Sequence, residues 1–436
     1  MEEKPKLRPV EVFPIRTDRG TMVCLRDVSG MSDRVVTASP QVVAVLQYFD
    51  GRHTVLDIQT DITRRTGSIV QSGDIKRIIA VLDEALMLEN GRFEAHRARV
   101  TKEFAESPVR PAASAGHSYP DDANELRGFL DGIVAEADAD VAHPPSGVTA
   151  SSCVAQPPPA GAVSSPSPQA RAPVPHQLRG LVAPHIDHRR GEKCYAAAYA
   201  ALDRTGPADL FILLGTAHAQ TSERFVLTRK DFETPLGRAK TDVDAVETLA
   251  KAAGRDLFAD EFAHRAEHSI ELELVFVQRL MEKTKHDFRV VPVLCGGYAE
   301  AMEEGKPPAE LPGVKGFIDA LRGVLGREKG RAVVVAGADL AHVGPRFGTP
   351  EKVTPALLRD LEAADRVSLS FVEKGDADGF LGHVALDGNA RNVCGVGPIW
   401  TALKTLEPCA ATLLNYEQWA EEDGSSAVTF AACTIQ

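Results

Sequence analysis

The sequence has no apolar run near the roughly 18 residues that a membrane-spanning helix needs. Its first residues, MEEKPK, lack the apolar core of a signal peptide, so a cytoplasmic location is expected. The seven cysteines are scattered and form no CxxC pair, which favours reduced thiols over a disulfide framework or a structural zinc site. A formal net charge of −12 argues against sequence-independent binding of nucleic acid. We therefore expect neither a membrane nor a nucleic-acid partner.

Three short motifs of common enzyme classes are also missing. The chain has no GxGxxG between a predicted strand and helix, no GxxxxGK[ST] and no GxSxG, so nucleotide binding and α/β-hydrolase chemistry have no local support. The composition is that of an ordinary globular protein, with 44% apolar and 25% charged residues. A length of 436 residues leaves room for two or three domains.

The first 100 residues predict a small α+β module. Short strands are expected over 7–34, followed by a helix that starts at Ser39-Pro40 and by helices over 54–66 and 72–87. Asn90-Gly91 predicts a turn into a further strand, and three helices with a hairpin are typical of a winged helix. DNA binding is disfavoured, because Lys76 and Arg77 are the only basic residues of the third helix. The module resembles the PqqD-like fold, which implies docking of a peptide or protein.

The rest of the chain changes composition twice. Residues 101–140 predict a connecting helix and the start of a second domain, with an apolar helix face formed by Leu126, Phe129, Leu130 and Ile133. Residues 141–178 are rich in Pro, Ala and Ser and cannot bury a core, so we expect a disordered linker without chemistry, in which His143 and Cys153 are bystanders.

Strands and helices alternate over 179–436, which predicts an α/β domain with a central, mostly parallel sheet and helices on both faces. The runs are apolar without polar alternation, as in strands buried on both sides. Strands are expected at 179–183, 209–215, 288–294, 331–337, 410–415 and 427–434. Helices are expected at 191–204, 241–253, 268–284, 315–326, 355–374 and 396–406.

Histidines follow three of these predicted strands. His185 comes after the first, His218 after the second, and Asp339-Leu-Ala-His342 after the one at 331–337. Ligands of open α/β sheets bind beyond the carboxyl ends of the strands, so these side chains are expected at one rim. His342 is a candidate general base or metal ligand, and Asp339, on the same turn, a candidate to orient it.

Two further groups could take part in chemistry. Glu267, His268 and Glu271 stand at the polar entry to a predicted helix, where we expect contact with substrate or support of the site rather than a separate metal site. Arg265 occupies the position that a HExxH zinc motif gives to glutamate. Cys394 lies among glycines at a helix N-terminus, where the helix dipole favours a thiolate, either as metal ligand or as nucleophile.

Taken in order, these residues resemble the Memo family over 109–140 and 179–436. The matching motifs are Arg110-Pro-Ala, Ala183-Pro-His185, Gly215-Thr-Ala-His218, Glu267-His-Ser-Ile-Glu271, Asp339-Leu-Ala-His342, Cys394-Gly with Pro398-Ile399, Leu414-Asn-Tyr416 and Ser425-Ser-Ala-Val428. With the N-terminal module, the chain is similar to members called AmmeMemoRadiSam system protein B. That name implies a radical-SAM enzyme and an AMMECR-type protein as partners.

The resemblance implies a fold shared with class III extradiol dioxygenases, which hold iron(II) with two His and one Glu. Carried over, His185, His218 and Cys394 are the expected metal ligands, with Asp339 and His342 lining the pocket. The mixed nitrogen and sulfur donors suit Fe(II) or Cu. Two positions depart from the family pattern: Ile186-Asp187-His188 makes the pocket mouth more polar and Asp187 a candidate acid, and Ser114 replaces a usual His.

Two functions remain open. The first is a metal-dependent redox or oxygen-using enzyme, with Asp187, Glu267, His268, Asp339 and His342 around the reacting groups. The second is a metal-binding or peptide-docking protein without turnover, which serves a radical-SAM partner. A thiol hydrolase that uses Cys394 with His342 is a weaker third possibility. The cysteine in place of the dioxygenase glutamate argues mildly against ordinary ring cleavage, because a thiolate is itself oxidisable.

Overall fold

The computed structural model describes residues 4–17, 20–27, 29–67, 69–142 and 178–436. The chain divides into two compact units, Met1–Pro108 and Val109–Gln436. Most of the expected linker at 141–178, with His143 and Cys153, lies outside the described residues. Within the described ranges, every helix is too short or too polar to cross a bilayer.

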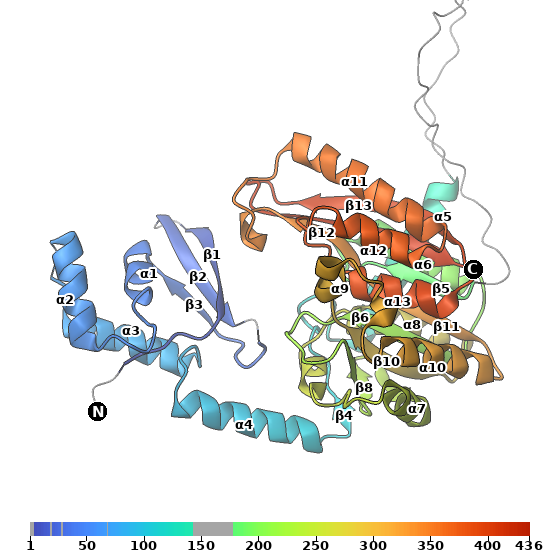
Figure 1. The fold of residues 1–436 in the computed structure, drawn as a ribbon, viewed down its shortest axis with the longest axis horizontal. Helices are drawn as coiled ribbons and strands as arrows, with labels where there is room; N and C mark the ends of the chain where they lie inside the picture. The colour runs from blue at the N-terminus through green and yellow to red at the C-terminus, as the bar shows by residue number, and fades with distance from the viewer. Residues whose placement is uncertain (1–3, 18–19, 28, 68, 143–177) are drawn as a thin grey trace, which may run out of the picture. The chain divides into compact units, whose positions relative to one another are not determined.

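The smaller unit combines an antiparallel sheet with four helices among its described residues (Figure 1). The expected short strands and first three helices are confirmed. Thr54 caps the second helix reciprocally with Asp57, and the core lies between the sheet and the helices. The elements are β1 (Val10–Thr17), β2 (Gly20–Asp27), β3 (Val35–Ala38), α1 (Pro40–Leu46), α2 (Val55–Thr66), α3 (Ser72–Glu84) and α4 (Gly91–Glu106).

The strand expected after Asn90-Gly91 is wrong. Asn90 is the N-cap of α4, and its side chain accepts the backbone N–H of Phe93. Phe93, Val100 and Phe104 then bury one face of that helix. Asn-Gly favours tight turns, but Asn also caps helices, and the apolar residues at helical spacing decide between the two. The order of strands first and helices afterwards leaves the winged-helix assignment unconfirmed.

The larger unit is built on one mixed sheet, in which eleven strands lie among the described residues. Its centre is parallel, in the order β5-β11-β6-β10-β9, and its flanks are largely antiparallel, so the expected mostly parallel sheet holds only for the centre. The strands are β4 (Val109–Arg110), β5 (Gly180–Ala183), β6 (Leu210–Thr216), β7 (Phe225–Leu227), β8 (Asp231–Thr234), β9 (Gly237–Thr241), β10 (Arg289–Cys295), β11 (Ala332–Gly337), β12 (Asp339–Val343), β13 (Ala411–Ala420) and β14 (Ala427–Ile435).

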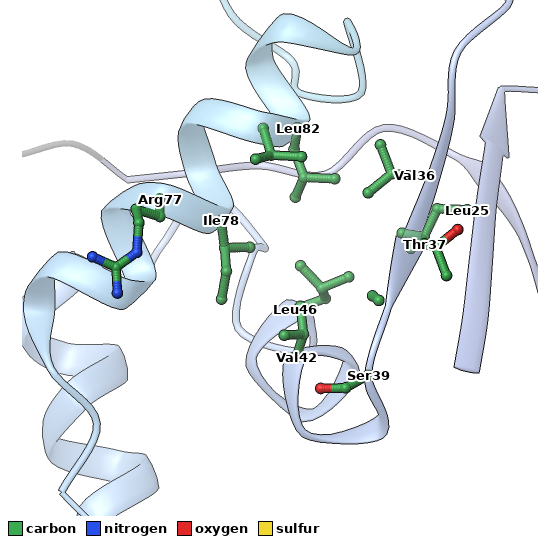
Figure 2. A pocket seen from close by; sticks show the side chains of 11 residues that line it. Leu25, Val36, Thr37, Ser39, Val42, Leu46, Arg77, Ile78 and Leu82 are labelled. Carbon is green, nitrogen blue, oxygen red and sulfur yellow. The ribbon is translucent and has the colours of Figure 1, made fainter. Parts of the chain in front are cut away.

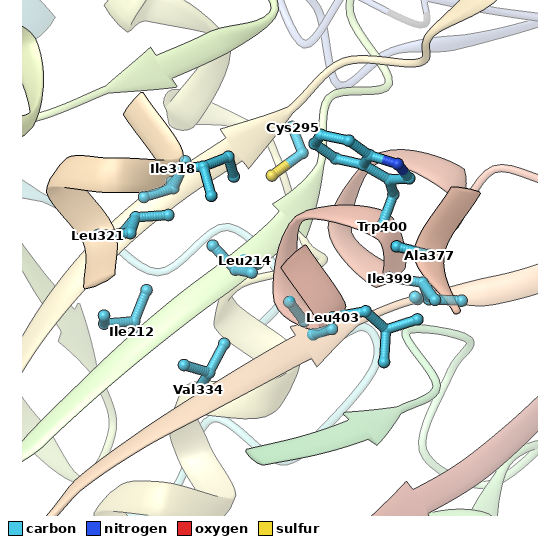
Figure 3. Packing of buried hydrophobic residues seen from close by; sticks show 14 of the residues in the cluster. Ile212, Leu214, Cys295, Ile318, Leu321, Val334, Ala377, Ile399, Trp400 and Leu403 are labelled. Carbon is cyan, nitrogen blue, oxygen red and sulfur yellow. The ribbon is translucent and has the colours of Figure 1, made fainter. Parts of the chain in front are cut away.

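Helices cover both faces of this sheet, as expected. Along one strand, Ile212 and Leu214 join the core on one face while Phe211 and Leu213 join the core on the other. That alternation explains why the strands read as continuous apolar runs. One face carries α5 (Ala123–Ala142), α6 (Glu192–Asp203) and α8 (Glu271–Thr284). The other carries α7 (Val243–Ala253), α10 (Val314–Arg327), α11 (Pro355–Glu373), α12 (Ala377–Ala385) and α13 (Val396–Leu406), with α9 (Ala299–Glu304) beside them. Figure 3 shows residues of α10, α12 and α13 packed against this face, among them Leu321, Ala377 and Trp400.

The predicted strands and helices of 179–436 are confirmed to within about three residues, except that β13 runs on to Ala420. Residues 225–241 were not predicted, and they form the short strands β7, β8 and β9. The expected turn at Asp339–His342 is wrong. These residues form β12, which pairs antiparallel with β14, a strand about ninety positions later in the sequence. The pairing partner is too distant for local periodicity to reveal it.

Candidate metal centre

The carboxyl ends of two parallel strands and the loop before a helix bring three of the predicted side chains together. His185 lies two residues after β5 and His218 two residues after β6, while Cys394 stands in the loop before α13. One donor atom from each of His185, His218 and Cys394 lies within 4.8 Å of the other two. The Cys394 Sγ and the His185 Nε2 are 3.3 Å apart. The edge of a tetrahedral site that joins a nitrogen and a sulfur ligand is about 3.5 Å, so this pair already has a spacing suited to a metal.

Both histidines use one ring nitrogen to bind the protein. His185 donates from Nδ1 to the Gly337 carbonyl at 2.9 Å, and His218 donates from Nδ1 to Glu267 at 3.0 Å. Each bond fixes the ring orientation and leaves Nε2 as the available donor, which is the usual arrangement of metal-binding histidines. Glu267 also accepts backbone N–H groups of His218, His268 and Ser269, and this set of bonds places the loop after β6 against the start of α8.

Charges in the cluster favour ionised partners. Burial opposes charging of His185, but Asp339 and Cys394 raise its pKa to about 9. Burial likewise opposes a thiolate at Cys394, yet His185 and His342 hold the pKa of this thiol well below its usual range. Glu267 raises the pKa of His218 against the effect of burial. These shifts favour a Cys394 thiolate paired with protonated imidazole rings.

Asp339 and His342 border the same cluster from β12. Asp339 is buried, accepts the backbone N–H of His185 at 2.9 Å and has an oxygen 3.8 Å from its Nε2. His342 donates from Nδ1 to the Leu340 carbonyl at 3.2 Å, and Cys394 raises its pKa against the effect of burial. Residues three apart on a regular strand face opposite sides. A register shift between Asp339 and His342 lets both approach the cluster.

The remaining predicted residues divide into two groups. The His268 ring stacks on His218 at 4.9 Å and meets His185 edge-on at 5.5 Å, so His268 belongs to the cluster. Asp187 accepts the backbone N–H of Arg189 and is not among the residues whose donor atoms converge at the candidate centre. The neighbouring His188 is buried in an aromatic cluster on the α5–α6–α8 face and donates to the Leu272 carbonyl.

Glu271 does not face the candidate metal centre but binds the segment that begins at Arg110. It is fully buried, and it accepts from the Arg110 guanidinium, the Tyr119 hydroxyl and the backbone of Ala113 and Ser114. The same Arg110 donates to the carbonyls of His264 and Glu267. Ser114, which differs from the usual His of the family pattern, therefore lies in the segment that binds the loop around Glu267. The contribution of Arg110 was not predicted, because the ion pair spans about 160 residues.

Comparison with known proteins gives the family. The family model described as Memo-like protein matches residues 110–434. The chain belongs to the Memo family. A MEMO1 family protein of Aquifex aeolicus is 24% identical over 98% of both chains, and one of Thermus thermophilus is 28% identical over 87% of this chain and 98% of its own length. A MEMO1 family protein of Methanosarcina mazei is 30% identical over 60% of this chain and 86% of its own.

The Memo match covers nearly all of the larger unit, including each residue of the candidate centre. The Aquifex relative matches this Memo-family chain across the smaller unit as well, since 98% of the chain is aligned. The Memo match itself begins at residue 110, directly after that unit.

Proposed function

We propose that this Memo-family chain binds a transition metal through His185, His218 and Cys394. The observation that carries the proposal is the convergence of two oriented imidazoles and a thiol from three distant segments. The mixed nitrogen and sulfur donors suit iron(II) or copper and disfavour magnesium or calcium. Three protein ligands leave coordination positions open, so a bound metal would supply redox chemistry with a small molecule or oxygen. We propose a redox or oxygen-using enzyme of this kind.

The surrounding residues then have distinct tasks. Glu267 holds the His218 ring through its Nδ1 and so fixes the tautomer. Asp339 holds the His185 backbone, and its carboxylate offsets positive charge beside the site. His342 donates from Nδ1 to a carbonyl, so Nε2 is the ring nitrogen that can exchange a proton with Cys394. His268, whose pKa burial and the neighbouring histidines lower to about 4, stays neutral and is suited to contact with substrate.

Metal content tests the ligand set directly. The purified full chain is stripped, reconstituted without oxygen with Fe(II) or Cu(I), desalted and analysed for bound metal. We expect one equivalent for the wild type and little for His185→Ala, His218→Ala or Cys394→Ala. The matched controls are His117→Ala and Cys409→Ala, which remove a histidine and a partly exposed cysteine outside the cluster. Full metal content in all three ligand variants would refute the assignment.

Oxygen uptake separates the enzyme from a metal carrier. A reconstituted protein with stoichiometric metal is tested for uptake with catecholic substrates. Uptake that disappears in His342→Ala, while metal content stays, supports catalysis by this chain. Stoichiometric metal without uptake favours the non-catalytic alternative.

A second function, peptide docking, is favoured by one feature of the smaller unit. β3 pairs only with β2 among the described strands, and an apolar pocket of about 220 Å³ lies beside it (Figure 2). The pocket is lined mainly by Val36, Ala38, Val42, Leu46, Ile78 and Val81. A free strand edge next to an apolar pocket suits an extended peptide that adds a strand and inserts a side chain. We propose such a peptide as its occupant, with radical-SAM and AMMECR-type proteins as the partners served.

Peptide display on the immobilised full chain tests this docking. Val81 lines the pocket and is 51% exposed, whereas Leu56 is 64% exposed on α2 and is not among the residues that line the pocket. We expect peptides selected on the wild type to bind Leu56→Arg equally and Val81→Arg at least tenfold more weakly. Equal binding to both variants would place the peptides elsewhere.

A further inference from the structure

The loop that carries Cys394 is held by its own side chains and by β12. The Asn389 side chain accepts the Val393 N–H at 2.8 Å and donates to the Val393 carbonyl at 3.3 Å. Gly395 donates its N–H to the Asp339 carbonyl at 3.0 Å. A Cβ at Gly395 would lie 2.3 Å from that carbonyl oxygen, so only glycine permits this approach. The Cys394 backbone is thus fixed on both sides.

The same loop grips the backbone of His342. The His342 N–H donates to the Arg391 carbonyl at 2.8 Å, and the Asn392 side-chain amide donates to the His342 carbonyl at 3.1 Å. Asn392 has a φ of 49°, a left-handed conformation that asparagine tolerates better than most residues. Both backbone groups of His342 therefore bind to the loop that carries Cys394, and this fixes the position of His342 relative to Cys394.

A buried carboxylate on α11 stands behind this arrangement. Asp365 is fully buried and accepts from Arg391 at 2.7 Å, from the Thr429 hydroxyl at 2.5 Å and from the Tyr416 hydroxyl at 3.0 Å. Arg391 is also buried and donates to the Ser368 hydroxyl at 3.3 Å. An arginine whose two terminal nitrogens donate to different acceptors has little freedom to rotate.

Asp365 connects the two halves of the site. Through Arg391 it holds the loop of Cys394, and through Thr429, which accepts the Ala341 N–H at 2.9 Å, it holds β12. We infer that Asp365 and Arg391 are positioning residues that set the spacing between the Cys394 thiolate and the β12 side chains at the metal centre. The inference rests on the proposed metal site, and neither residue belongs to the candidate ligand set.

Two readouts test the inference, one without metal and one with Co(II) as the probe. In the stripped full chain, hydrogen exchange of the His342 and Gly395 amides reports whether the loop stays bound to β12. With Co(II), the thiolate charge-transfer band and the affinity report the placement of Cys394. The first variant is Arg391→Met, which leaves the buried Asp365 carboxylate without its cation and can impair folding. The isosteric Asp365→Asn and the conservative Arg391→Lys are therefore measured as well.

We expect Arg391→Met and Asp365→Asn to bind Co(II) about 10–100-fold more weakly, with a weaker thiolate band and faster exchange of both amides. Arg391→Lys should restore part of the affinity. The matched control is Arg279→Met, which breaks an arginine–carboxylate pair with Asp131 on the opposite helical layer and should leave all three readouts unchanged.

Unchanged Co(II) affinity and band in Arg391→Met and Asp365→Asn would overturn the inference, and so would unchanged exchange of the two amides. A wild type without a thiolate band would instead refute the proposed ligand set. In that case the exchange measurement still decides whether Asp365 and Arg391 hold the loop to β12.

Discussion

The sharpest prediction concerns Glu267→Gln, which changes one atom beside a candidate ligand. The carboxylate accepts four N–H groups: the backbone and Nδ1 of His218 at 3.1 and 3.0 Å, and the backbones of His268 and Ser269 at 2.9 and 3.0 Å. A glutamine has one acceptor oxygen, so its NH₂ must face one of these two pairs of donors. Leaving such a donor unpaired costs about 1–3 kcal/mol.

We expect the His218 ring to lose its fixed orientation, and metal affinity to fall 10–100-fold, as for comparable outer-shell changes. That fall equals about 1.4–2.7 kcal/mol of binding free energy. Competition with a chromogenic chelator, without oxygen, measures it. The matched control is Glu282→Gln on α8, where the carboxylate pairs with Arg127 at the surface. If Glu267→Gln binds metal within threefold of the wild type, this carboxylate does not orient the ligand.

Three other changes probe the frame around the site. Burial lowers the pKa of His264 to about 4. His264 of the unfolded chain therefore takes up its proton at a higher pH than His264 of the folded chain, and the fold should lose up to about 3 kcal/mol of stability as pH falls from 6.5 to 4. His264→Gln should remove that loss, as measured by urea unfolding. Gly337→Ala would put a Cβ 2.4 Å from the Ser269 carbonyl and should lower both metal affinity and melting temperature, whereas Gly326→Ala in open space on α10 should do neither. Deleting 1–108 should leave metal content unchanged, and its loss would show that the smaller unit helps to build the centre.

The sequence predicted the parts of the molecule that depend on nearby residues. The strands that end before His185 and His218 are apolar runs bounded by polar residues, and this local pattern also placed both imidazoles at one rim. The residues around Cys394 do not by themselves distinguish a metal ligand from an inert thiol. The family resemblance selected Cys394, because an isolated cysteine before a helix is more often inert.

What escaped prediction depends on long-range pairing. β12 is held in the sheet by its pairing with β14. Arg110 supports the site because its guanidinium forms an ion pair with Glu271, and both side chains are fully buried. The same holds for Asp365 and Arg391. No local period or spacing encodes such contacts. The sequence therefore indicates which groups could bind a metal, but not which residues hold those groups in place.

One strand has a consequence for how the protein is made. β14 pairs with β5 on one part of its length, with β12 on another, and with β13 along its far edge. β5 and β14 are separated by most of the larger unit in the sequence, so the ribosome exposes β5 long before its neighbour exists. Until β14 emerges, β12 lacks the strand that it pairs with among the described residues, and the nascent chain lacks the scaffold of the proposed metal centre. Metal loading is therefore expected to follow translation, and a chain that stalls before β14 should emerge as an apoprotein prone to aggregation.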